Sequence, residues 1–283
     1  MSAPPLDPTP PSAKLAQLLE LMREAGSVLV CYSGGIDSAV VLAAGHRALG
    51  ERAIGMTAVS PSLPASERDD ARRIADEIGA DQREVESAEL SREGYVANGP
   101  DRCFHCKSEL YELAEQKRVE WQLRYVVNGT NTDDLGDYRP GLEAAKRAQV
   151  RSPFLELGFT KADVRAVAQE LGLRAWDKPA AACLSSRIPY GTSVTPERLS
   201  QVGGLEAELR GLGFRRSRVR YHDRIARIEL DLEELPRLLD LQLRQTVVEA
   251  GKRHGFTYVT LDLAGYRTGS HNEVLSGRSL RIV

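Results

Sequence analysis

Residues 33–38, Ser-Gly-Gly-Ile-Asp-Ser, have the types and the order of an anion-binding turn. An apolar, β-type run at 28–30 precedes them and a helical pattern follows at once, so they join a strand to a helix N-terminus. Two glycines let the backbone approach a ligand, and the first N–H groups of the helix point at it. The carboxylate of Asp37 would repel phosphates unless Mg²⁺ lay between them. The stretch predicts a polyphosphate site with Mg²⁺ near Asp37, and an ordinary strand–helix turn is the alternative.

These six residues closely resemble the SGGxDS pyrophosphate loop of the PP-loop, or N-type, ATP pyrophosphatases. The resemblance implies that ATP is cleaved between its α and β phosphates and that a substrate is adenylated. It implies ATP-binding roles for Ser33, Gly34, Gly35, Asp37 and Ser38. No Gly-x-x-x-x-Gly-Lys-Ser/Thr motif occurs, so the P-loop geometry is absent.

Three of the four cysteines are placed where thiols could do chemistry. Cys103 and Cys106 stand at an expected helix start, with a spacing that suits a shared metal or a redox pair. Two small buried thiols are the alternative. Cys183 lies among small residues near Arg187, which can lower a thiol pKa or bind phosphate. Cys31 falls on the first strand and is expected in the core.

Acidic and basic groups gather at two other places. A β-type run at 125–128 ends in a polar loop that starts at Gly129 and contains the adjacent acids Asp133 and Asp134. Either acid could hold Mg²⁺ or position a nucleophile, whereas a solvated turn held by side-chain hydrogen bonds leaves both without a role.

Arg216, Arg218 and Arg220 alternate along an expected strand and therefore share one face. Guanidinium groups in that arrangement suit phosphate or carboxylate, and a solvated face is the alternative. Arg267, on a polar loop bounded by glycines, is a further candidate.

The elements that must position these groups alternate between strand and helix. The periodicity predicts helices at 14–25, 67–78, 108–118 and 161–171, strands at 28–30, 52–59, 82–86 and 125–128, and a strand end at 151–155. Ser66 and Thr160 are the expected N-caps of two helices. The order predicts an α/β fold with a doubly wound parallel sheet, whose ligands bind at the carboxyl ends of the strands.

A second pattern follows near residues 190–195. It comprises a helix at 197–212, a hairpin of strands at 216–222 and 226–231, a helix at 232–254 that contains Pro236, and a strand at 256–263. This order predicts a small ferredoxin-like α+β layer. We therefore predict a disordered lead-in at 1–13, a PP-loop ATP pyrophosphatase domain at 14–192, and a C-terminal α+β domain for substrate binding and oligomerisation at 193–283.

Composition limits the class of protein, its partners and its expected location. The 283 residues are 42% apolar and 28% charged, as in soluble globular proteins, and the net charge of −2 argues against a nucleic-acid partner. No apolar run approaches the ~18 residues of a membrane span, and the N-terminus lacks the order of a secretion signal. Four cysteines do not make a disulfide scaffold, so a reducing, cytoplasmic location is expected.

From about residue 14 to its end the chain resembles the LarE-type sulfurtransferases. The resemblance is carried by residues 33–38, 129–134, 137–141 and 182–191, the last of which contains Cys183 and is the most specific. These enzymes use ATP to put sulfur on pyridinium-3,5-biscarboxylic acid mononucleotide, during assembly of the nickel-pincer nucleotide cofactor of lactate racemase.

The family has two chemical versions. In one, a single cysteine at the position of Cys183 gives up its sulfur and becomes dehydroalanine. In the other, three cysteines hold a 4Fe-4S cluster whose fourth iron binds an extra sulfide. The presence of Cys103 and Cys106 matches the second version, with Cys183 as the third ligand.

The resemblance also implies the remaining roles. A substrate carboxylate is adenylated and then attacked by sulfide, and Gly129, Asp133 and Asp134 complete the nucleotide site. Arginines of the C-terminal region hold the substrate phosphate; Arg218 and Arg220 match best, followed by Arg187 and Arg267. A sulfide source is needed, and family members form hexamers. The alternatives are the sacrificial version with Cys103 and Cys106 structural or on zinc, a cluster-dependent tRNA thiolase, and a nucleotide-binding sensor.

Overall fold

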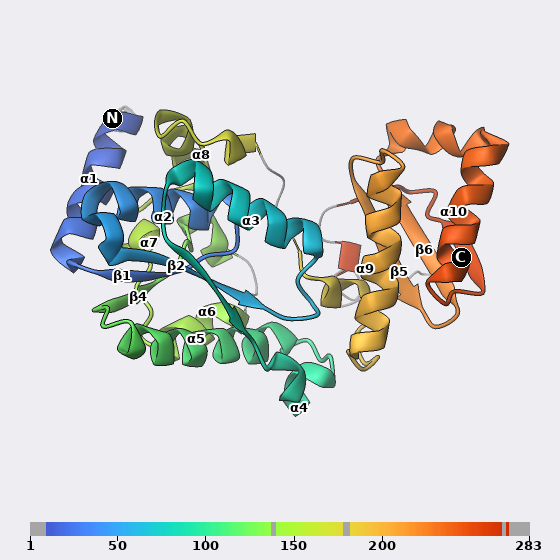
Figure 1. Ribbon diagram of the computed structural model, residues 1–283, viewed down its shortest axis with the longest axis horizontal. Coiled ribbons are helices and arrows are strands. Elements are labelled where there is room, and N and C mark those ends of the chain that lie inside the picture. Colours follow the sequence, from blue (N-terminus) through green and yellow to red (C-terminus); the bar gives the residue numbers. More distant parts are fainter. Residues whose placement is uncertain (1–9, 137–139, 178–181, 268–269, 272–283) are drawn as a thin grey trace, which may run out of the picture. The chain divides into compact units, whose positions relative to one another are not determined.

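The computed structural model describes residues 10–136, 140–177, 182–267 and 270–271 (Figure 1). Contacts within the chain divide it into two compact units. The first unit consists of residues 1–60, 67–88 and 103–181, and the second of residues 61–66, 89–102 and 182–283. Two short segments from the N-terminal part thus belong to the second unit, which no pattern in the sequence indicated. The domain boundary near residue 192 stays a prediction.

Four parallel strands form the sheet of the first unit. They are β1 (Val28–Cys31), β2 (Ala53–Val59), β3 (Gln82–Glu86) and β4 (Tyr125–Val127), in the order β3-β2-β1-β4. Val28 pairs with Ala53 on one side and with Tyr125 on the other, so β1 is central. Its carboxyl end leads directly into residues 33–38. The predicted parallel sheet is confirmed, and the anion-binding turn lies where such sheets bind ligands.

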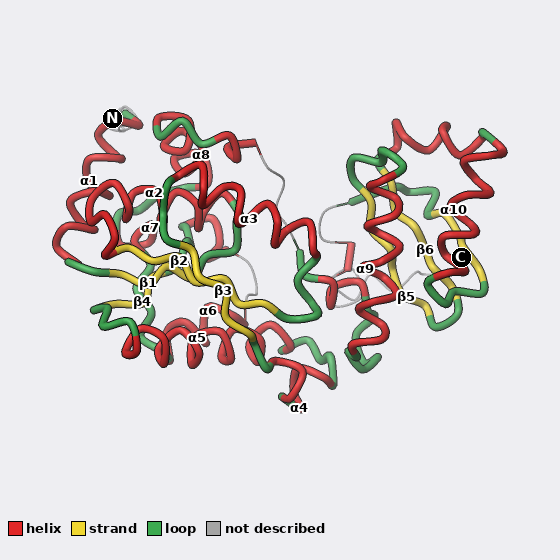
Figure 2. Tube along the Cα trace, in the orientation of Figure 1, coloured by secondary structure: helices red, strands yellow, loops and turns green. Residues whose placement is uncertain are grey.

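Helices cover both faces of this sheet (Figure 2). They are α1 (Pro11–Ala25), α2 (Ile36–Leu49), α3 (Ala65–Ile78), α5 (Arg102–Glu120), α6 (Pro140–Arg147), α7 (Pro153–Glu156) and α8 (Lys161–Glu170). Val28 and Val30 belong to one buried cluster, with residues of α1, α2 and α8, whereas Leu29 packs in another with Ala114 of α5. Because successive side chains of a strand point to opposite faces, a continuous apolar strand needs this double cover.

The sheet of the second unit has three strands, β5 (Ser217–His222), β6 (Ile225–Leu230) and β7 (Tyr258–Leu261), in that order. β5 and β6 form the predicted antiparallel hairpin, and β7 pairs parallel with β6 after a crossover through α10 (Leu241–Arg253). Helix α9 (Pro196–Gly211) buries Leu199, Val202, Leu205 and Leu209. The predicted α-β-β-α-β order is confirmed.

Shorter elements connect these parts. They are α4 (Glu93–Val96) and the 3₁₀ helices η1 (Gly50–Arg52), η2 (Glu89–Ser91), η3 (Thr132–Gly136), η4 (Arg174–Asp177), η5 (Leu184–Arg187) and η6 (Leu232–Leu239). Among the described helices, none is long and apolar enough to cross a membrane.

Three predicted helix starts were wrong. Helix α1 begins at Pro11, so residues 11–13 are helical instead of lead-in; proline is favoured in a first turn. Residues 1–9 of the predicted lead-in lie outside the described residues. Helix α3 begins at Ala65, which places Ser66 inside the helix and not at its N-cap. Helix α5 begins at Arg102, six residues before the predicted start at 108, so both of its cysteines are helical.

Two further segments differ from prediction. Residues 151–155 were expected to end a strand, but only Arg151 bridges to β4, and Pro153–Glu156 is the short helix α7. Residues 232–254 were expected to form one helix and instead form η6 and α10. Pro236 lacks an N–H and cannot continue an α-helical ladder. Asp240 then caps α10, its carboxylate accepting the N–H of Leu243 at 2.7 Å.

Candidate active site

The predicted anion-binding turn forms a cradle at the N-terminus of α2. Gly34 has a φ of +71°, and a Cβ there would lie 2.7 Å from Cα of Ala71, so only glycine fits. The hydroxyl of Ser38 accepts the N–H of Ser33 at 3.2 Å and donates to the carbonyl of Gly35 at 3.0 Å. The turn is thereby closed around the first helical N–H groups, which are the ordinary donors to a phosphate.

Gly129 places the end of β4 directly against this cradle. A Cβ on Gly129 would lie 2.8 Å from the carbonyl carbon of Asp37 and 2.9 Å from the amide nitrogen of Ser38. Real Cβ atoms do not approach backbone so closely, so the contact requires glycine. The structure therefore brings together the two sequence motifs that were predicted to serve one site.

The carboxylate of Asp37 is held by side chains from two other elements. Its Oδ1 accepts Nδ2 of Asn131 at 3.1 Å, and its Oδ2 forms an ion pair with Nζ of Lys161, the first residue of α8. The side chains of Asp37 and Lys161 are each 29% exposed, so both remain open to a ligand. Sequence reasoning missed Lys161, whose only signal was its place at a helix start. A cation beside a phosphate cradle can oppose phosphate charge directly.

Asp133 and Asp134 build the loop that follows β4. The N–H of Asn131 donates to Oδ2 of Asp134 at 3.0 Å, and the N–H of Asp133 donates to Oδ1 of Asn131 at 3.0 Å. Oδ2 of Asp133 accepts the N–H of Lys161 at 3.2 Å, at the start of α8. These hydrogen bonds are of the kind expected from the alternative, a turn held by side-chain hydrogen bonds, and they give both acids a structural role. A role of either acid in holding Mg²⁺ stays a prediction. Asp134 also lines the cavity described next.

A cavity of about 230 Å³ opens beside the cradle. It is lined by Cys31, Ser33, Gly35, Asp37, Ser38, Lys107, Tyr111, Asn128, Gly129, Thr130, Asp134, Gly141 and Leu142. Lys107 and Tyr111, both on α5, were missed. Lys107 directly follows Cys106, and Tyr111 lies one helical turn further on the same face. The hydroxyl of Tyr111 accepts Nδ2 of Asn128 at 3.2 Å. The cavity lining thus combines amide, hydroxyl and ammonium donors with the carboxylates of Asp37 and Asp134.

Cys31 was expected in the core and lies at its boundary. It packs against the cluster of Leu29 and also lines the cavity. Burial raises the pKa of the Cys31 thiol to about 12, although the charge of Lys107 acts in the opposite direction. Cys31 is therefore a neutral, unreactive thiol at neutral pH.

The three remaining cysteines lie on two elements. Cys103 and Cys106 occupy the first turns of α5 at a spacing of i and i+3, so both thiols face the same side of the helix. Cys103 and Cys183 are exposed, and Cys106 is half-buried. Cys103 and Cys106 belong to the first unit, and Cys183, directly before η5, belongs to the second. Among the residues that the structure describes, no three His, Cys, Asp or Glu side chains are grouped to hold a metal ion.

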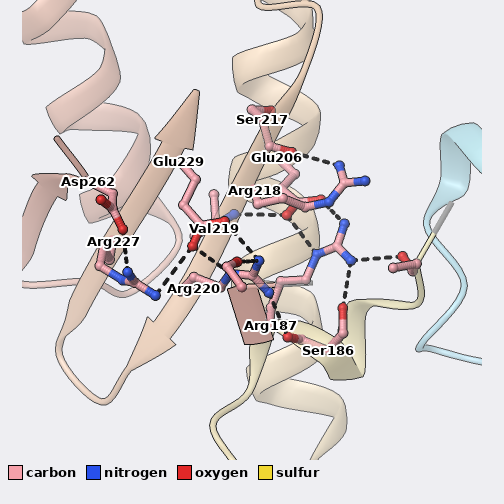
Figure 3. A network of polar contacts seen from close by, with 12 residues as sticks. Ser186, Arg187, Glu206, Ser217, Arg218, Val219, Arg220, Arg227, Glu229 and Asp262 are labelled. Carbon is pink, nitrogen blue, oxygen red and sulfur yellow. Dashed lines mark hydrogen bonds and ion pairs between the residues drawn. The ribbon is translucent and has the colours of Figure 1, made fainter. Parts of the chain in front are cut away.

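Two of the predicted substrate arginines are buried in ion pairs (Figure 3). The guanidinium of Arg187 donates from Nε and Nη2 to the carboxylate of Glu206, both at 2.9 Å. The guanidinium of Arg220 donates to both oxygens of Glu229, at 2.9 and 2.8 Å. Nη1 of Arg187 also donates to the carbonyl of Cys183 at 2.9 Å. Nη1 of Arg220 donates to the carbonyl of Ser186 at 2.9 Å. These two arginines therefore anchor residues 182–195, the Cys183 loop, to β5, β6 and α9.

Arg218, on β5 two residues before Arg220, makes different contacts. Its Nη1 donates to the carbonyl of Ser217 at 2.8 Å, and its guanidinium lies 5.4 Å from the ring centre of Tyr266. Within the described residues no carboxylate pairs with it. Burial and the neighbouring charge of Arg187 lower the pKa of Arg218. A half-buried guanidinium that no described carboxylate neutralises retains donors for an anion.

The other two candidate arginines of the second unit, Arg216 and Arg267, are less specific candidates for binding an anion. Arg216 lies just before β5 and pairs with Asp231 at 3.7 Å, with its guanidinium over the ring of Tyr266. Arg267 is exposed.

A second cavity, of about 240 Å³, lies within the second unit. Its lining includes Arg187, Arg220 and Arg227 together with His222 and His271. Burial and the charges of Arg102, Arg220 and Arg187 lower the pKa of His271 to about 4, so its imidazole is neutral at neutral pH. Nε2 of His271 is buried with no partner among the described atoms. All three arginines of the lining are paired with carboxylates, Arg187 with Glu206, Arg220 with Glu229 and Arg227 with Asp262.

The Arg220–Glu229 pair yields a stability prediction. The Glu229 side chain is 1% exposed and also pairs with Arg227 at 3.3 Å, so neutralising it leaves two guanidinium groups close together. We expect Glu229→Gln to lower the free energy of unfolding by about 3–5 kcal/mol, as for other buried pairs that lose one partner. Urea unfolding at pH 7 measures this, with the exposed Glu233→Gln as control. A loss below 1 kcal/mol in Glu229→Gln would contradict it.

Comparison with known proteins adds three findings. Residues 15–93, which include the cradle, match the asparagine synthase family model. The chain is 38% identical over 270 residues to the pyridinium-3,5-bisthiocarboxylic acid mononucleotide synthase of Lactiplantibacillus plantarum, covering 95% of this chain and 97% of that protein. It is also 44% identical over 265 residues to an uncharacterised protein of Synechocystis, covering 93% of this chain and 98% of that protein.

Proposed function

Since this chain belongs to the LarE-type family of ATP-dependent sulfurtransferases, we propose that it converts the carboxylates of pyridinium-3,5-biscarboxylic acid mononucleotide to thiocarboxylates. The observation that carries the substrate assignment is the 38% identity to the Lactiplantibacillus synthase over nearly the whole of both chains. The cradle at residues 33–38 supports the ATP-dependent half independently, because its geometry suits a polyphosphate.

In the first half-reaction ATP lies on the cradle with its phosphates at the N-terminus of α2. A substrate carboxylate oxygen attacks the α phosphorus, the bond to the β-phosphate oxygen breaks, and pyrophosphate leaves with that electron pair. Asp37 is the residue that would hold Mg²⁺, because its carboxylate lies beside the helix N-terminus and is oriented by Asn131. Bound Mg²⁺ would neutralise phosphate charge. Lys107, in the cavity lining, and Lys161, paired with Asp37, supply positive charge near the phosphates.

For the second half-reaction we propose that Cys103, Cys106 and Cys183 hold a 4Fe-4S cluster. The donor set fits, because thiolates are the ordinary ligands of such clusters and two of these thiols share one helix face. When bound, the cluster supplies the sulfur that replaces the adenylate. The residues of the chain then have to present the acyl-adenylate to that sulfur and keep water away from it.

The substrate phosphate is assigned chiefly to Arg218. Its guanidinium has no acid partner among the described residues, whereas those of Arg187 and Arg220 are neutralised by Glu206 and Glu229. Arg187 and Arg220 line the second cavity but are paired with acids, so they and the exposed Arg267 are the weaker candidates. An external sulfide source, a hexameric assembly and a cytoplasmic location complete the proposal, all by family resemblance.

Anaerobic turnover tests the function. Protein prepared without oxygen is incubated with the biscarboxylate mononucleotide, ATP, Mg²⁺ and sulfide, and AMP, pyrophosphate and thiocarboxylate are measured by mass spectrometry. One AMP and one pyrophosphate are expected per thiocarboxylate. Pyrophosphate release without any sulfur product would refute the substrate assignment. Salt-sensitive, sub-micromolar binding of total tRNA in a gel shift would favour tRNA thiolation instead.

Metal analysis tests the cluster. We expect about four irons and four acid-labile sulfides per chain in anaerobic protein, with absorbance near ~400 nm, and loss of both in Cys106→Ala. Cys31→Ala, which alters a thiol outside the proposed set, should keep them. One zinc per chain, or loss of H₂S from Cys183 after turnover in intact mass, would contradict the cluster.

Arg218→Ala is expected to raise the KM for the mononucleotide about 100-fold, since a charge-assisted phosphate contact contributes about 3 kcal/mol. The KM for ATP should change less than about threefold, because the ATP cradle lies in the first unit. Steady-state pyrophosphate release measures both constants. Arg244→Ala, an exposed arginine on α10, serves as control. An equal rise in both constants would argue against a substrate-phosphate role.

A further inference from the structure

The loop that carries Cys183 is held by a buried polar network within the second unit. Arg102, whose side chain is almost fully buried, donates from Nη1 to the carbonyl of Ser185 at 2.8 Å and to Oδ1 of Asn98 at 2.6 Å. Asn98 in turn donates from Nδ2 to the carbonyls of Pro189 and Thr192, at 2.8 and 2.9 Å. One guanidinium and one amide thus fix the loop backbone at three points after Cys183.

Tyr95 contacts a side chain of the same loop, that of Ser185. The hydroxyl of Tyr95 donates to Oε1 of Glu89 at 3.2 Å and is hydrogen-bonded to Oγ of Ser185. Ser62 joins the same carboxylate through its hydroxyl, while its carbonyl accepts the N–H of Leu184 at 2.8 Å. All of these side chains are buried. In such surroundings a satisfied polar network specifies one arrangement and resists alternatives.

The thiol of Cys183 is therefore exposed, while the backbone that follows it is held in place by buried hydrogen bonds. Cys183 is exposed, yet Leu184 and Ser185, the next two residues, are 4% and 0% exposed. Apart from Ser62, the holding residues come from 89–102, the segment immediately before Cys103. Arg102 therefore binds the loop of one proposed ligand while being the direct sequence neighbour of another. Sulfur transfer is sensitive to such placement, because a misplacement of about 1 Å can lower a rate about 100-fold.

We propose that Arg102 is a positioning residue for sulfur transfer, which acts with Tyr95 by fixing the backbone that presents Cys183. The proposal rests on the proposed function for its catalytic consequence, but its structural part does not. Arg102 directly precedes Cys103 and donates a hydrogen bond to the backbone of the Cys183 loop, whereas the ATP cradle belongs to the first unit. Loss of its guanidinium should therefore slow the sulfur-transfer half-reaction and leave the adenylation half-reaction largely unchanged.

Arg102→Met, which keeps the side-chain length and removes the donors, is the main test. In the anaerobic assay the thiocarboxylate formed per pyrophosphate released should fall at least about tenfold, with the pyrophosphate rate within about threefold of wild type. Backbone amides of residues 184–188 should exchange hydrogen at least about tenfold faster, while those of β5 and β6 stay unchanged. Arg102→Lys, which can still donate to the carbonyl of Ser185, should restore part of the ratio.

Arg198→Met is the matched control, because Arg198 also donates to a loop carbonyl, that of Ser193 at 2.6 Å. It should leave the product ratio unchanged. If Arg102→Met does not fold, Tyr95→Phe replaces it, with the same faster exchange and lower ratio expected. Unchanged exchange and ratio, or an equal fall in both half-reactions, would overturn the proposal. Faster exchange in the variant, combined with no sulfur product even from wild type, would instead refute the proposed function and leave the positioning role standing.

Discussion

Replacing Gly129 with alanine is expected to lower ATP-dependent pyrophosphate release at least about 100-fold. The added Cβ would lie 2.8 Å from the carbonyl carbon of Asp37 and 2.9 Å from the amide nitrogen of Ser38. Both atoms belong to the first turn of α2, whose N–H groups form the cradle. Neither can move aside as a flexible side chain would, so the end of β4 and the start of α2 must separate. The phosphate donors then lose their alignment.

Pyrophosphate release with saturating mononucleotide measures the effect, and thermal unfolding shows whether the variant is folded. Gly211→Ala is the matched control, because a Cβ at that position has no neighbour within 4 Å. It should keep wild-type activity. Activity of Gly129→Ala within threefold of wild type would mean that the contact between β4 and the cradle is dispensable, and the site would have to be reconsidered.

Replacing Cys183 with serine is expected to separate the two half-reactions. Thiocarboxylate formation should fall at least about 1,000-fold, because a hydroxyl neither ligates iron as a thiolate does nor donates sulfur. Pyrophosphate release should stay within about threefold, because the cradle and Asp37 lie in the first unit. Product ratios from anaerobic turnover measure both rates. Ser193→Ala, which changes an exposed residue of the same loop, should leave both rates unchanged.

Cys106→Ser distinguishes the two possible sulfur sources. If the three thiols hold a cluster, Cys106→Ser should lose sulfur transfer as completely as Cys183→Ser, together with its iron. If Cys183 gives up its own sulfur, Cys106→Ser should still form one thiocarboxylate per chain. Sulfur transfer by Cys183→Ser itself at the wild-type rate would exclude both chemistries for this loop.

Local patterns predicted the parts of the fold that local physics controls. The strand, turn and helix around residues 33–38 follow from an apolar run, two glycines and a helical period within a few residues. The N-cap at Thr160 and the hairpin of β5 and β6 are likewise confirmed, and the structure adds that Asp163 completes a capping box with Thr160. Helix starts were less reliable. Helix α3 begins at Ala65, directly after Pro64, where no favoured N-cap residue stands, and α5 begins after Asp101, a favoured N-cap type that the predicted start at 108 did not use.

Residue types and their spacing along the chain were enough to predict the chemistry available to this protein: a phosphate cradle, three thiols outside the core, and a set of arginines on the second sheet. How the charged groups are used became visible from the folded chain alone. It pairs Asp37 with Lys161, 124 residues further along the chain, and neutralises Arg187 and Arg220 with Glu206 and Glu229. It also builds the Cys183 loop on residues 89–102. The physical reason is that a charge acquires its partner by burial, and burial depends on packing between distant segments that no local period encodes.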